Sequence, residues 1–461
     1  MMNYRFLLFT ICLLLISCEQ EKRTEKITVH TESTAKVTLM TLDPGHFHAA
    51  LVQKTMYEEV SPTVYVYAPK GPEVVDFLNK IDQYNTRENT PTQWKVEKYL
   101  GADYVEKMVS EKAGNVMVVA GKNSKKIDYI LAAVEAGLNV YADKPLVINP
   151  AGFEKLKKAF QVAQEKEVLI YDIMTERFEA TTVLQKLLSQ EAEVFGTLVD
   201  GSTTEPAISK ESVHHFFKYV SGKPLVRPAW FFDVNEEGEG IVDVTTHLVD
   251  LIQWEAFPNE IIDSSDVKMV AAKRWPTVLT LDEFQKVTGL SAFPNYLQKD
   301  VKDGKLYVYC NGEMNYTIKG KTAKVSVVWN YQAPEGTGDT HYSVMRGTKS
   351  NLIIKQGAEE NFQPTLYIQA IEAANFESAL QKVLLSEIAQ KMLGIEAQKV
   401  DENTWRMIIP QKFKIGHEAH FAQVTENYLK YLAANQLPDW EVPNMITKYF
   451  TTIEAYKTAS E

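Results

Sequence analysis

The sequence predicts an α/β protein in which a Rossmann-like domain with a parallel sheet precedes a second α/β domain. Between residues 36 and 172, short apolar segments alternate with helical stretches, and this alternation implies parallel strands joined by right-handed crossovers. Between about 193 and 368 strand candidates dominate, and residues 324–329 alternate polar with apolar side chains. Such alternation is typical of an antiparallel sheet with one solvated face.

The first half offers strands and helices in regular succession. The expected strands are 37–42, 64–67, 115–120, 138–142 and 168–171, and the expected helices are 49–59, 125–136 and 151–166. Gly137 follows the second of these helices, where a glycine suits the left-handed cap. Ligands of a parallel sheet bind beyond the carboxyl ends of its strands, so the residues that follow each strand are the candidates for a site.

The second half is richer in strands and closes with helices. The expected strands are 194–199, 267–272, 306–310, 323–329 and 352–355, and the expected helices are 376–393, 421–434 and 440–456. We therefore divide the folded part into a dinucleotide-binding domain, 36–172, and a substrate and oligomerisation domain, 173–461.

The N-terminus predicts export and lipidation. Arg5 precedes an apolar run, 6–16, that is too short to span a bilayer. Its end, Leu15-Ile16-Ser17-Cys18, resembles the cleavage box of bacterial lipoproteins. This resemblance implies a signal peptide at 1–18, acylation of Cys18 and a lipid anchor on the periplasmic or outer surface of a bacterial membrane. The polar stretch 19–35 is then a tether; the alternative is a plain signal peptide.

Composition narrows the possible partners. The 461 residues are 45% hydrophobic and 24% charged, which indicates a globular chain and not a disordered one. Without Arg5 the chain has 48 basic and 60 acidic residues, and this acidity argues against a nucleic-acid partner. Of the cysteines, only Cys310 belongs to the folded part, so no disulfide is expected, and no Cys/His spacing suggests a structural metal.

The loop after the first strand lies where a dinucleotide fingerprint belongs. Aligning Gly45 with the middle glycine of G-x-G-x-x-G places Asp43 on the first glycine and His48 on the third. The middle glycine lets the backbone approach a pyrophosphate. Gly45, His46 and Phe47 are therefore candidate cofactor-binding residues, with the histidines of this loop either binding phosphate or replacing glycine contacts.

Lys144 is the first candidate for acid/base chemistry. It follows the apolar strand 138–142 in the segment Asp143-Lys144-Pro145, at the carboxyl edge of the expected sheet. Hydride transfer from an alcohol to nicotinamide requires a group that takes the hydroxyl proton, and a lysine beside the cationic ring has its pKa lowered toward a useful range. The alternative is a lysine that only caps a strand end. As a neighbour of the cofactor, Lys144 is also a candidate for binding it.

Asp243, His247 and Asp250 form the second candidate set. Their spacing places them on one face of a helix. Histidine can relay a proton near neutral pH while a carboxylate orients its ring. The alternative assigns Asp243 to a helix N-cap, His247 to packing and Asp250 to solvent. His214, beside aromatic residues, either lines a sugar pocket or belongs to a buried cluster.

Taken together, these motifs resemble the glucose–fructose oxidoreductase and inositol dehydrogenase (Gfo/Idh/MocA) family. Asp143-Lys144-Pro145 is similar to the family's Glu-Lys-Pro, and Asp243 with His247 is similar to its Asp-x-x-x-His helix. The resemblance implies an open, mostly antiparallel C-terminal sheet that can form a homo-oligomer. It also implies substrate-binding roles for Arg177, Trp230 and Asp250, and His214 is a substrate-binding candidate because of its aromatic neighbours.

The function expected from these residues is hydride transfer between a sugar or glycoside hydroxyl and NAD or NADP. Lys144 would be the acid/base group, His247 its relay and Asp243 the orienting carboxylate. Because unfolded export carries no cofactor, the dinucleotide would have to be tightly bound. Two alternatives remain: NAD-assisted glycoside hydrolysis or elimination without net redox, and a non-enzymatic carbohydrate-binding lipoprotein.

Overall fold

The computed structural model describes residues 37–220 and 223–460. The expected signal peptide, Cys18 and the tether lie outside these residues. Within the described ranges, no helix has both the length and the apolar character needed to cross a bilayer. Both sheets belong to one compact unit, which begins at Lys36.

The N-terminal sheet has six parallel strands in the order β3-β2-β1-β4-β5-β6. This is the order of a dinucleotide-binding fold, in which the strand order reverses between the first and fourth strands. The strands are β1 (Leu39–Leu42), β2 (Thr63–Ala68), β3 (Lys95–Leu100), β4 (Val116–Val119), β5 (Asn139–Asp143) and β6 (Ile170–Ile173). The helices are α1 (His48–Leu51), α2 (Pro72–Thr86), α3 (Tyr104–Glu111), α4 (Asn123–Glu135) and α5 (Pro150–Glu165).

The parallel sheet confirms the predicted α/β class, with two local corrections. β3 was not expected, because half of its side chains are exposed and polar at the sheet edge and none is fully buried. The helix expected over 49–59 is also wrong: α1 is a single turn of four residues, followed by turns.

The C-terminal domain is built on a ten-stranded sheet. Its main path runs β10-β12-β13-β7-β14-β15-β16-β18-β17, and every neighbouring pair is antiparallel except β13 with β7. The strands are β7 (Ile208–Phe217), β10 (Val267–Leu279), β11 (Val301–Lys302), β12 (Lys305–Ile318), β13 (Lys321–Gln332), β14 (Thr340–Arg346), β15 (Ser350–Lys355), β16 (Thr365–Ala370), β17 (Glu396–Lys399) and β18 (Thr404–Ile408).

One expectation for this domain was wrong. The strand expected over 194–199 is a set of turns, with only an isolated bridge from Leu198 to Gly347. The segment around His214 is the end of β7, which lies between β13 and β14 inside the sheet. The strand expectations at β10, β12, β13 and β15 were correct in place.

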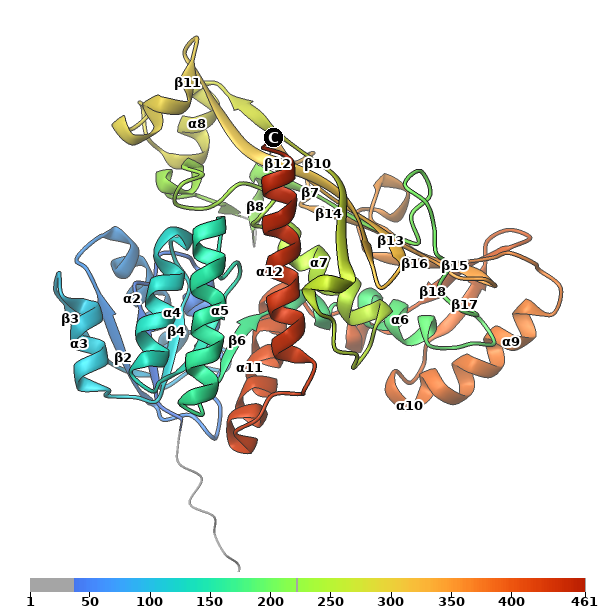
Figure 1. The fold of residues 1–461 in the computed structure, drawn as a ribbon, viewed down its shortest axis with the longest axis horizontal. Helices are drawn as coiled ribbons and strands as arrows, with labels where there is room; N and C mark the ends of the chain where they lie inside the picture. The colour runs from blue at the N-terminus through green and yellow to red at the C-terminus, as the bar shows by residue number, and fades with distance from the viewer. Residues whose placement is uncertain (1–36, 221–222, 461) are drawn as a thin grey trace, which may run out of the picture. The chain divides into compact units, whose positions relative to one another are not determined.

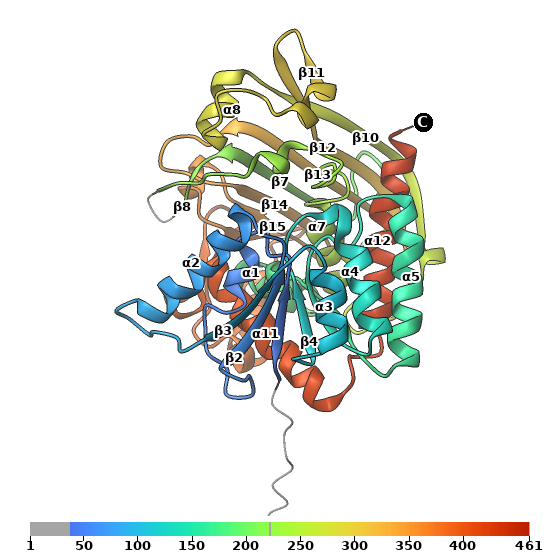
Figure 2. The ribbon, with the colours of Figure 1, turned by 90° about the vertical axis from the view of Figure 1, so that its left-hand side faces the viewer.

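Helices connect the two sheets (Figures 1 and 2). α12 (Glu441–Thr458) packs against α5 of the N-terminal domain and against α7 (Thr245–Ala256) and β10 of the C-terminal domain. α11 (His417–Ala434) contacts β6 and α1. The remaining helices and short strands are α6 (Ala180–Ser189), α8 (Leu281–Thr288), α9 (Phe376–Val383), α10 (Ala389–Lys391), β8 (Tyr219–Val220) and β9 (Lys223–Pro224).

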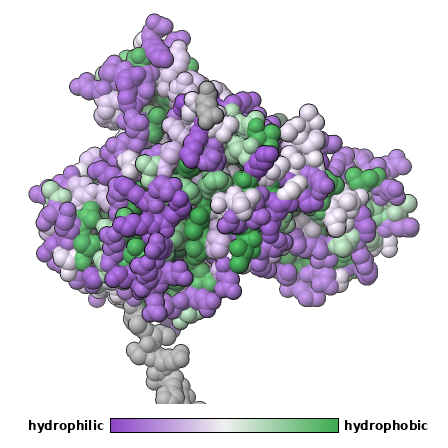
Figure 3. Space-filling model, in the orientation of Figure 1, coloured by the Kyte–Doolittle hydropathy of each residue, from purple (hydrophilic) through white to green (hydrophobic). Residues whose placement is uncertain are grey.

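The outer faces of the helices on the N-terminal sheet are mainly hydrophilic, as the left side of Figure 3 shows. Their inner faces are apolar: α4 buries Ile127, Ile130 and Val134, and α5 buries Phe153 and Leu156. Since the sheet is covered on both faces by helices, its strands read as continuous apolar runs. The expected homo-oligomer through the C-terminal sheet remains a prediction.

Candidate functional site

A cavity of about 670 Å³ lies beyond the carboxyl ends of β1 and β5. Its walls also come from β7, β13 and β14 of the large sheet and from α7. A cavity of this size holds a small ligand or the reactive end of a larger one. The two domains therefore meet around a ligand site at the edge of the parallel sheet where such sites are expected.

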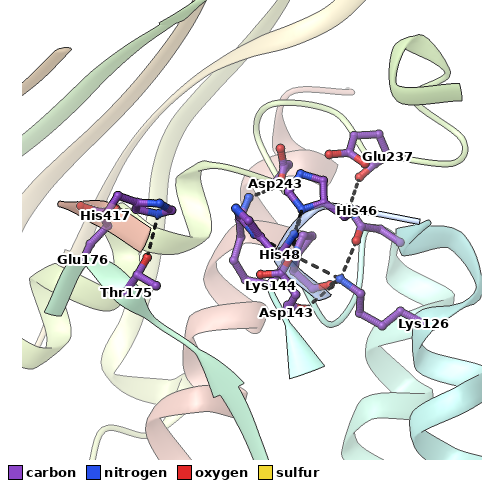
Figure 4. Close-up of polar contacts among 12 residues, drawn as sticks. His46, His48, Lys126, Asp143, Lys144, Thr175, Glu176, Glu237, Asp243 and His417 are labelled. Carbon is purple, nitrogen blue, oxygen red and sulfur yellow. Dashed lines mark hydrogen bonds and ion pairs between the residues drawn. The ribbon is translucent and has the colours of Figure 1, made fainter. Parts of the chain in front are cut away.

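Lys144 and Asp243 form an ion pair in this cavity (Figure 4). The distance from Lys144 Nζ to Asp243 Oδ1 is 2.6 Å, and the two side chains are only 13% and 7% exposed. Burial by itself would lower the pKa of Lys144, but Asp243 and Asp143 outweigh burial and raise it above its usual value. Lys144 is therefore a cation in the protein alone, contrary to the lowered pKa expected beside a cofactor.

His247 lines the same cavity from α7. Its Nδ1 is buried and has no hydrogen-bond partner among the described residues. Burial and the charge of Lys144 hold the pKa of His247 well below its usual range. The imidazole is thus neutral at pH 7, with hydrogen-bonding capacity that a ligand can use. Asp243 is not a helix N-cap, because its carboxylate binds Lys144 and the cap position is Val244.

A second lysine, Lys126, holds the segment that carries Lys144. Its ammonium is fully buried and donates to Asn123 Oδ1 and to the backbone carbonyls of Asp143 and Pro145, at 2.6–3.1 Å. Burial lowers the pKa of Lys126 to about 8. The sequence analysis missed this residue. A signal existed, since Lys126 lies on the same face of α4 as the buried Ile127 and Ile130.

The loop after β1 has Asp43 and His48 where a glycine-rich loop has its first and third glycines. Asp43 takes a positive φ of 46°, a conformation that asparagine and aspartate tolerate better than most residues. Its carboxylate accepts a hydrogen bond from Tyr129 at 2.8 Å and so turns away from the cavity. A Cβ at Gly121 would lie 2.5 Å from the carbonyl oxygen of Asp43, so only glycine fits where β4 ends against this loop.

His46, His48 and Asp143 gather at the edge of the cavity. The distances from Asp143 Oδ2 are 3.0 Å to His48 Nδ1 and 3.7 Å to His46 Nδ1. Burial raises the pKa of Asp143, but His48 and Lys126 outweigh burial and hold it below its usual range. His46 and Phe47 line the cavity as expected for the cofactor end of the site, whereas Gly45 does not line it. Asp143 was named only within a motif, and its pairing with the histidines was missed.

Arg177 and Asp250 do not line the cavity, which corrects their expected role in binding substrate. Arg177 donates to both carboxylate oxygens of Asp250 at 2.7 Å and to Glu441 of α12 at 2.9–3.0 Å. Lys448 joins the cluster by bridging Asp250 and Asp172. All five side chains are at most 8% exposed. The cluster therefore pairs its charged groups inside the protein and away from the cavity.

Trp230 also lies outside the cavity, although the sequence suggested that it contacts substrate. Only 5% of it is exposed. A Cβ at Gly45 would lie 3.6 Å from the Trp230 ring, so the indole packs behind the loop that follows β1. Trp230 thus supports the loop and does not face the substrate.

Another part of the cavity wall carries aromatic and polar side chains. His214 lines the cavity, stacks on Trp329 with ring centroids 4.9 Å apart, and pairs with Asp339 at 3.0 Å. Aromatic faces pack on apolar faces of a ligand, while nearby polar groups bind its hydroxyls. Glu176 and His417 complete the lining and were missed, because nothing in their local sequence marks them. Burial and Glu179 raise the pKa of Glu176 to about 7.

His341 makes the free energy of unfolding depend on pH. Burial, Lys210 and His214 lower its pKa to about 3, from an ordinary 6.5. As the pH falls below 6.5, the unfolded chain binds a proton at His341 while the folded chain does not, so stability is lost between 6.5 and 3. We expect His341→Gln to be more stable relative to wild type near pH 5 than at pH 7, by about 2 kcal/mol.

Urea unfolding of both proteins at the two pH values measures this difference. His341→Asn serves as the matched variant, because it also removes the titrating ring and must show the same change. An unchanged difference between wild type and variant at both pH values would contradict the prediction.

The residues present fit a nicotinamide dinucleotide best at its nicotinamide end. His247 and Lys144 line a cavity beside Phe47, at the point where the strand order of the sheet reverses. The phosphate-binding part departs from the usual pattern. The backbone N–H groups of Gly45 and His46 both donate to Ala120 at 3.1 Å, and α1 is a single turn.

A six-stranded dinucleotide-binding sheet, joined to a large open sheet around an acid/base cavity, defines a two-domain nicotinamide-dependent oxidoreductase. The comparisons agree: residues 64–172 match "Oxidoreductase family, NAD-binding Rossmann fold", and residues 184–460 match "Putative oxidoreductase C terminal domain". The chain belongs to the Gfo/Idh/MocA-type oxidoreductase family and is an NAD(P)-dependent enzyme. This result removes the non-enzymatic alternative.

The solved structures include a close relative. A "putative oxidoreductase" from Parabacteroides merdae is 53% identical, with 92% of this chain and 98% of that chain covered and a TM-score of 0.90. A "putative oxidoreductase" from Thermotoga maritima, with 13% identity, has a TM-score of 0.57 over 92% of this chain and 98% of that one. Levoglucosan dehydrogenase in complex with NADH, with 12% identity, has a TM-score of 0.58 over 92% of this chain and 97% of that one. The last two likenesses show the fold alone. No curated protein is significantly similar to the chain.

Proposed function

We propose that this enzyme transfers a hydride between a nicotinamide cofactor and a hydroxyl group of a sugar or glycoside. One observation carries the proposal: a charged Lys144, paired with Asp243, shares a cavity with the neutral imidazole of His247. The same enclosure therefore holds a proton donor and a hydrogen-bond acceptor, which is the combination that interconversion of an alcohol and a ketone requires.

In this proposal each side chain has a separate role. Lys144 and His247 contact the reacting hydroxyl. The Lys144 ammonium gives its proton to the oxygen in ketone reduction; in alcohol oxidation the ammonium first loses a proton to solvent, and the resulting amine accepts the proton of the hydroxyl. Asp243 holds the ammonium in place through its 2.6 Å contact. Phe47, His46 and Lys144 would hold the nicotinamide end of the cofactor. When bound, the cofactor supplies the hydride acceptor or donor.

A carbohydrate substrate is supported by the aromatic part of the cavity wall. His214 and Trp329 provide stacked rings, and Asp339, Gln356 and Lys218 provide polar groups around them. Neighbours of the same fold include levoglucosan dehydrogenase in complex with levoglucosan and with L-sorbose. Both ligands are sugars or sugar derivatives.

One observation favours a second candidate, glycoside cleavage without net redox. Glu176 lines the cavity, and with a pKa of about 7 it is partly protonated near neutral pH. A carboxylic acid beside a transiently oxidised sugar can protonate the leaving oxygen. In that case Lys144 and His247 would serve the same oxidation step.

The test uses purified full-length protein in detergent, incubated with NAD or NADP and a panel of neutral sugars and glycosides. The expected result is reduced nicotinamide in amounts equal to the keto product, identified by mass spectrometry. Release of reducing sugar without accumulation of reduced cofactor would replace the proposal by the second candidate. No turnover of any substrate with either cofactor would overturn both.

For localisation, we propose that Cys18 carries a lipid that anchors the enzyme to a bacterial membrane, on the evidence of Leu15-Ile16-Ser17-Cys18. Metabolic labelling with a fatty-acid probe tests this proposal. A Cys18→Ser variant that is labelled as strongly as wild type would contradict it.

A further inference from the structure

His46, His48 and Asp143 form a group with the geometry of metal ligands. One ligand atom from each residue lies within 4.8 Å of the others, and no other such group of three occurs in residues 37–220 and 223–460. The histidines follow β1 and Asp143 ends β5, so the parallel sheet brings the group together. Figure 4 shows the rings and the carboxylate turned toward one another.

The separations match those of ligands that share one ion. Zinc binds imidazole nitrogen and carboxylate oxygen at about 2.0–2.2 Å, so two ligands of a tetrahedral site lie roughly 3.3 Å apart. The distances from Asp143 Oδ2 to the histidine Nδ1 atoms are 3.0 Å and 3.7 Å, on either side of that value. The ligand atoms of the two histidines also lie within 4.8 Å of one another.

The group is enclosed and held in place. Its side chains are 21%, 13% and 7% exposed for His46, His48 and Asp143. The His48 ring packs on Phe421 of α11 at 4.7 Å between centroids, and Lys126 fixes the backbone carbonyl of Asp143. Such support around the ligands is what orders a metal site.

The charges near the group leave its carboxylate available. Lys144 follows Asp143 in the chain, but its ammonium pairs with Asp243 at 2.6 Å. The Lys126 ammonium donates its hydrogen bonds to Asn123 and to backbone carbonyls, and it donates none to the Asp143 carboxylate. Among the described residues, His46 Nδ1 accepts a hydrogen bond from the backbone N–H of His48, at a long distance of 3.4 Å. A metal ion bound at His46 Nδ1 would replace this hydrogen bond.

We propose that His46, His48 and Asp143 bind one first-row divalent metal ion, with the remaining coordination position open to the cavity. All three residues line that cavity, so a water or a ligand hydroxyl can take the open position. Two imidazoles and one carboxylate suit zinc, iron or manganese, and the usual order of affinities favours zinc among these three. A hydrogen-bonded His48–Asp143 pair without metal is the competing explanation.

The first arm of the test uses unaltered full-length protein in detergent. The protein is stripped with a chelator, dialysed and titrated with zinc in competition with a chromophoric chelator. We expect one zinc per chain, and cobalt in its place should give the visible absorption of a four- or five-coordinate site. Binding well below one equivalent, or cobalt absorption typical of a hexa-aquo ion, would overturn the proposal.

The second arm assigns the ligands. His48→Gln and Asp143→Asn should each weaken zinc binding by at least about 10–100-fold, the loss that follows removal of even an outer-shell partner. His214→Gln is the matched control, because this cavity histidine pairs with Asp339 and should leave zinc binding unchanged. Equal weakening by the control, or unchanged binding by both ligand variants, would sink the assignment. Circular dichroism shows whether each variant is folded.

The metal site is tested independently of the proposed hydride transfer, although His46 takes part in both proposals. Zinc binding is measured without substrate or cofactor, so a zinc-loaded protein that oxidises no sugar would remove the proposed function and keep the metal site. A sugar dehydrogenase that binds no zinc would do the reverse.

Discussion

Lys144→Met is expected to lower kcat for sugar oxidation by about 10²–10⁴-fold, the usual contribution of a positioned acid or base. Methionine keeps much of the side-chain volume but has no proton to exchange with the substrate oxygen. It also leaves Asp243 as an unpaired carboxylate in the cavity, since the 2.6 Å contact is lost. Steady-state formation of reduced nicotinamide measures the change, and binding of the cofactor is followed separately.

Two further variants separate chemistry from folding. Asp243→Asn keeps Lys144 but removes the charge that raises its pKa, so the ionisation of the lysine in the pH–rate profile should move to lower pH. Lys125→Met, on an exposed neighbour of the buried Lys126, is the control and should leave kcat unchanged. Wild-type activity in Lys144→Met would show that Lys144 is only a strand-end lysine.

Arg177→Met is expected to reduce the free energy of unfolding by about 3–5 kcal/mol, the loss typical of removing one partner from a buried ion pair. Arg177 is 8% exposed and donates four hydrogen bonds to Asp250 and Glu441. Without Arg177, Asp250 keeps its contact with Lys448, but Glu441 loses its cationic partner. Urea unfolding at neutral pH measures the difference.

A control and a double variant sharpen this test. Arg406→Met removes the same charge at an exposed position of β18, and we expect a change of no more than about 0.5 kcal/mol. Arg177→Met/Glu441→Gln should lose less than the sum of its single variants, because the second change removes the carboxylate that the first leaves unpaired. A stable Arg177→Met protein would restore Arg177 as a candidate for binding substrate.

Local patterns predicted much of the fold. The apolar runs at β1, β4, β5 and β6 belong to a parallel sheet buried on both faces, where continuous hydrophobicity is required. The strand β3 was not predicted, because an edge strand needs no apolar pattern. The strand predicted over 194–199 was wrong, because an apolar run also suits buried turns. The pairing of β7 between β13 and β14 could not be foreseen, since it depends on contacts far apart in the sequence.

The same division holds for the site. Lys144, Asp243 and His247 were found from the sequence because each directly follows a strand or lies at helical spacing, and the structure brings them to one cavity. Arg177 and Asp250 were misassigned because a buried ion pair and a substrate-binding pair use the same residue types. Their partner Glu441 lies 264 residues from Arg177, a separation that no local pattern reports.

By itself, the sequence determined the alternation of strands and helices, and with it a parallel sheet whose carboxyl edge carries a lysine and a histidine. These features depend on backbone periodicity and on residues adjacent in the chain. Only the tertiary structure decided which charged groups face the cavity and which neutralise one another in the interior. That choice depends on burial and on partners from distant segments. It leaves His46, His48 and Asp143 at the cavity and places the Arg177 cluster in the interior.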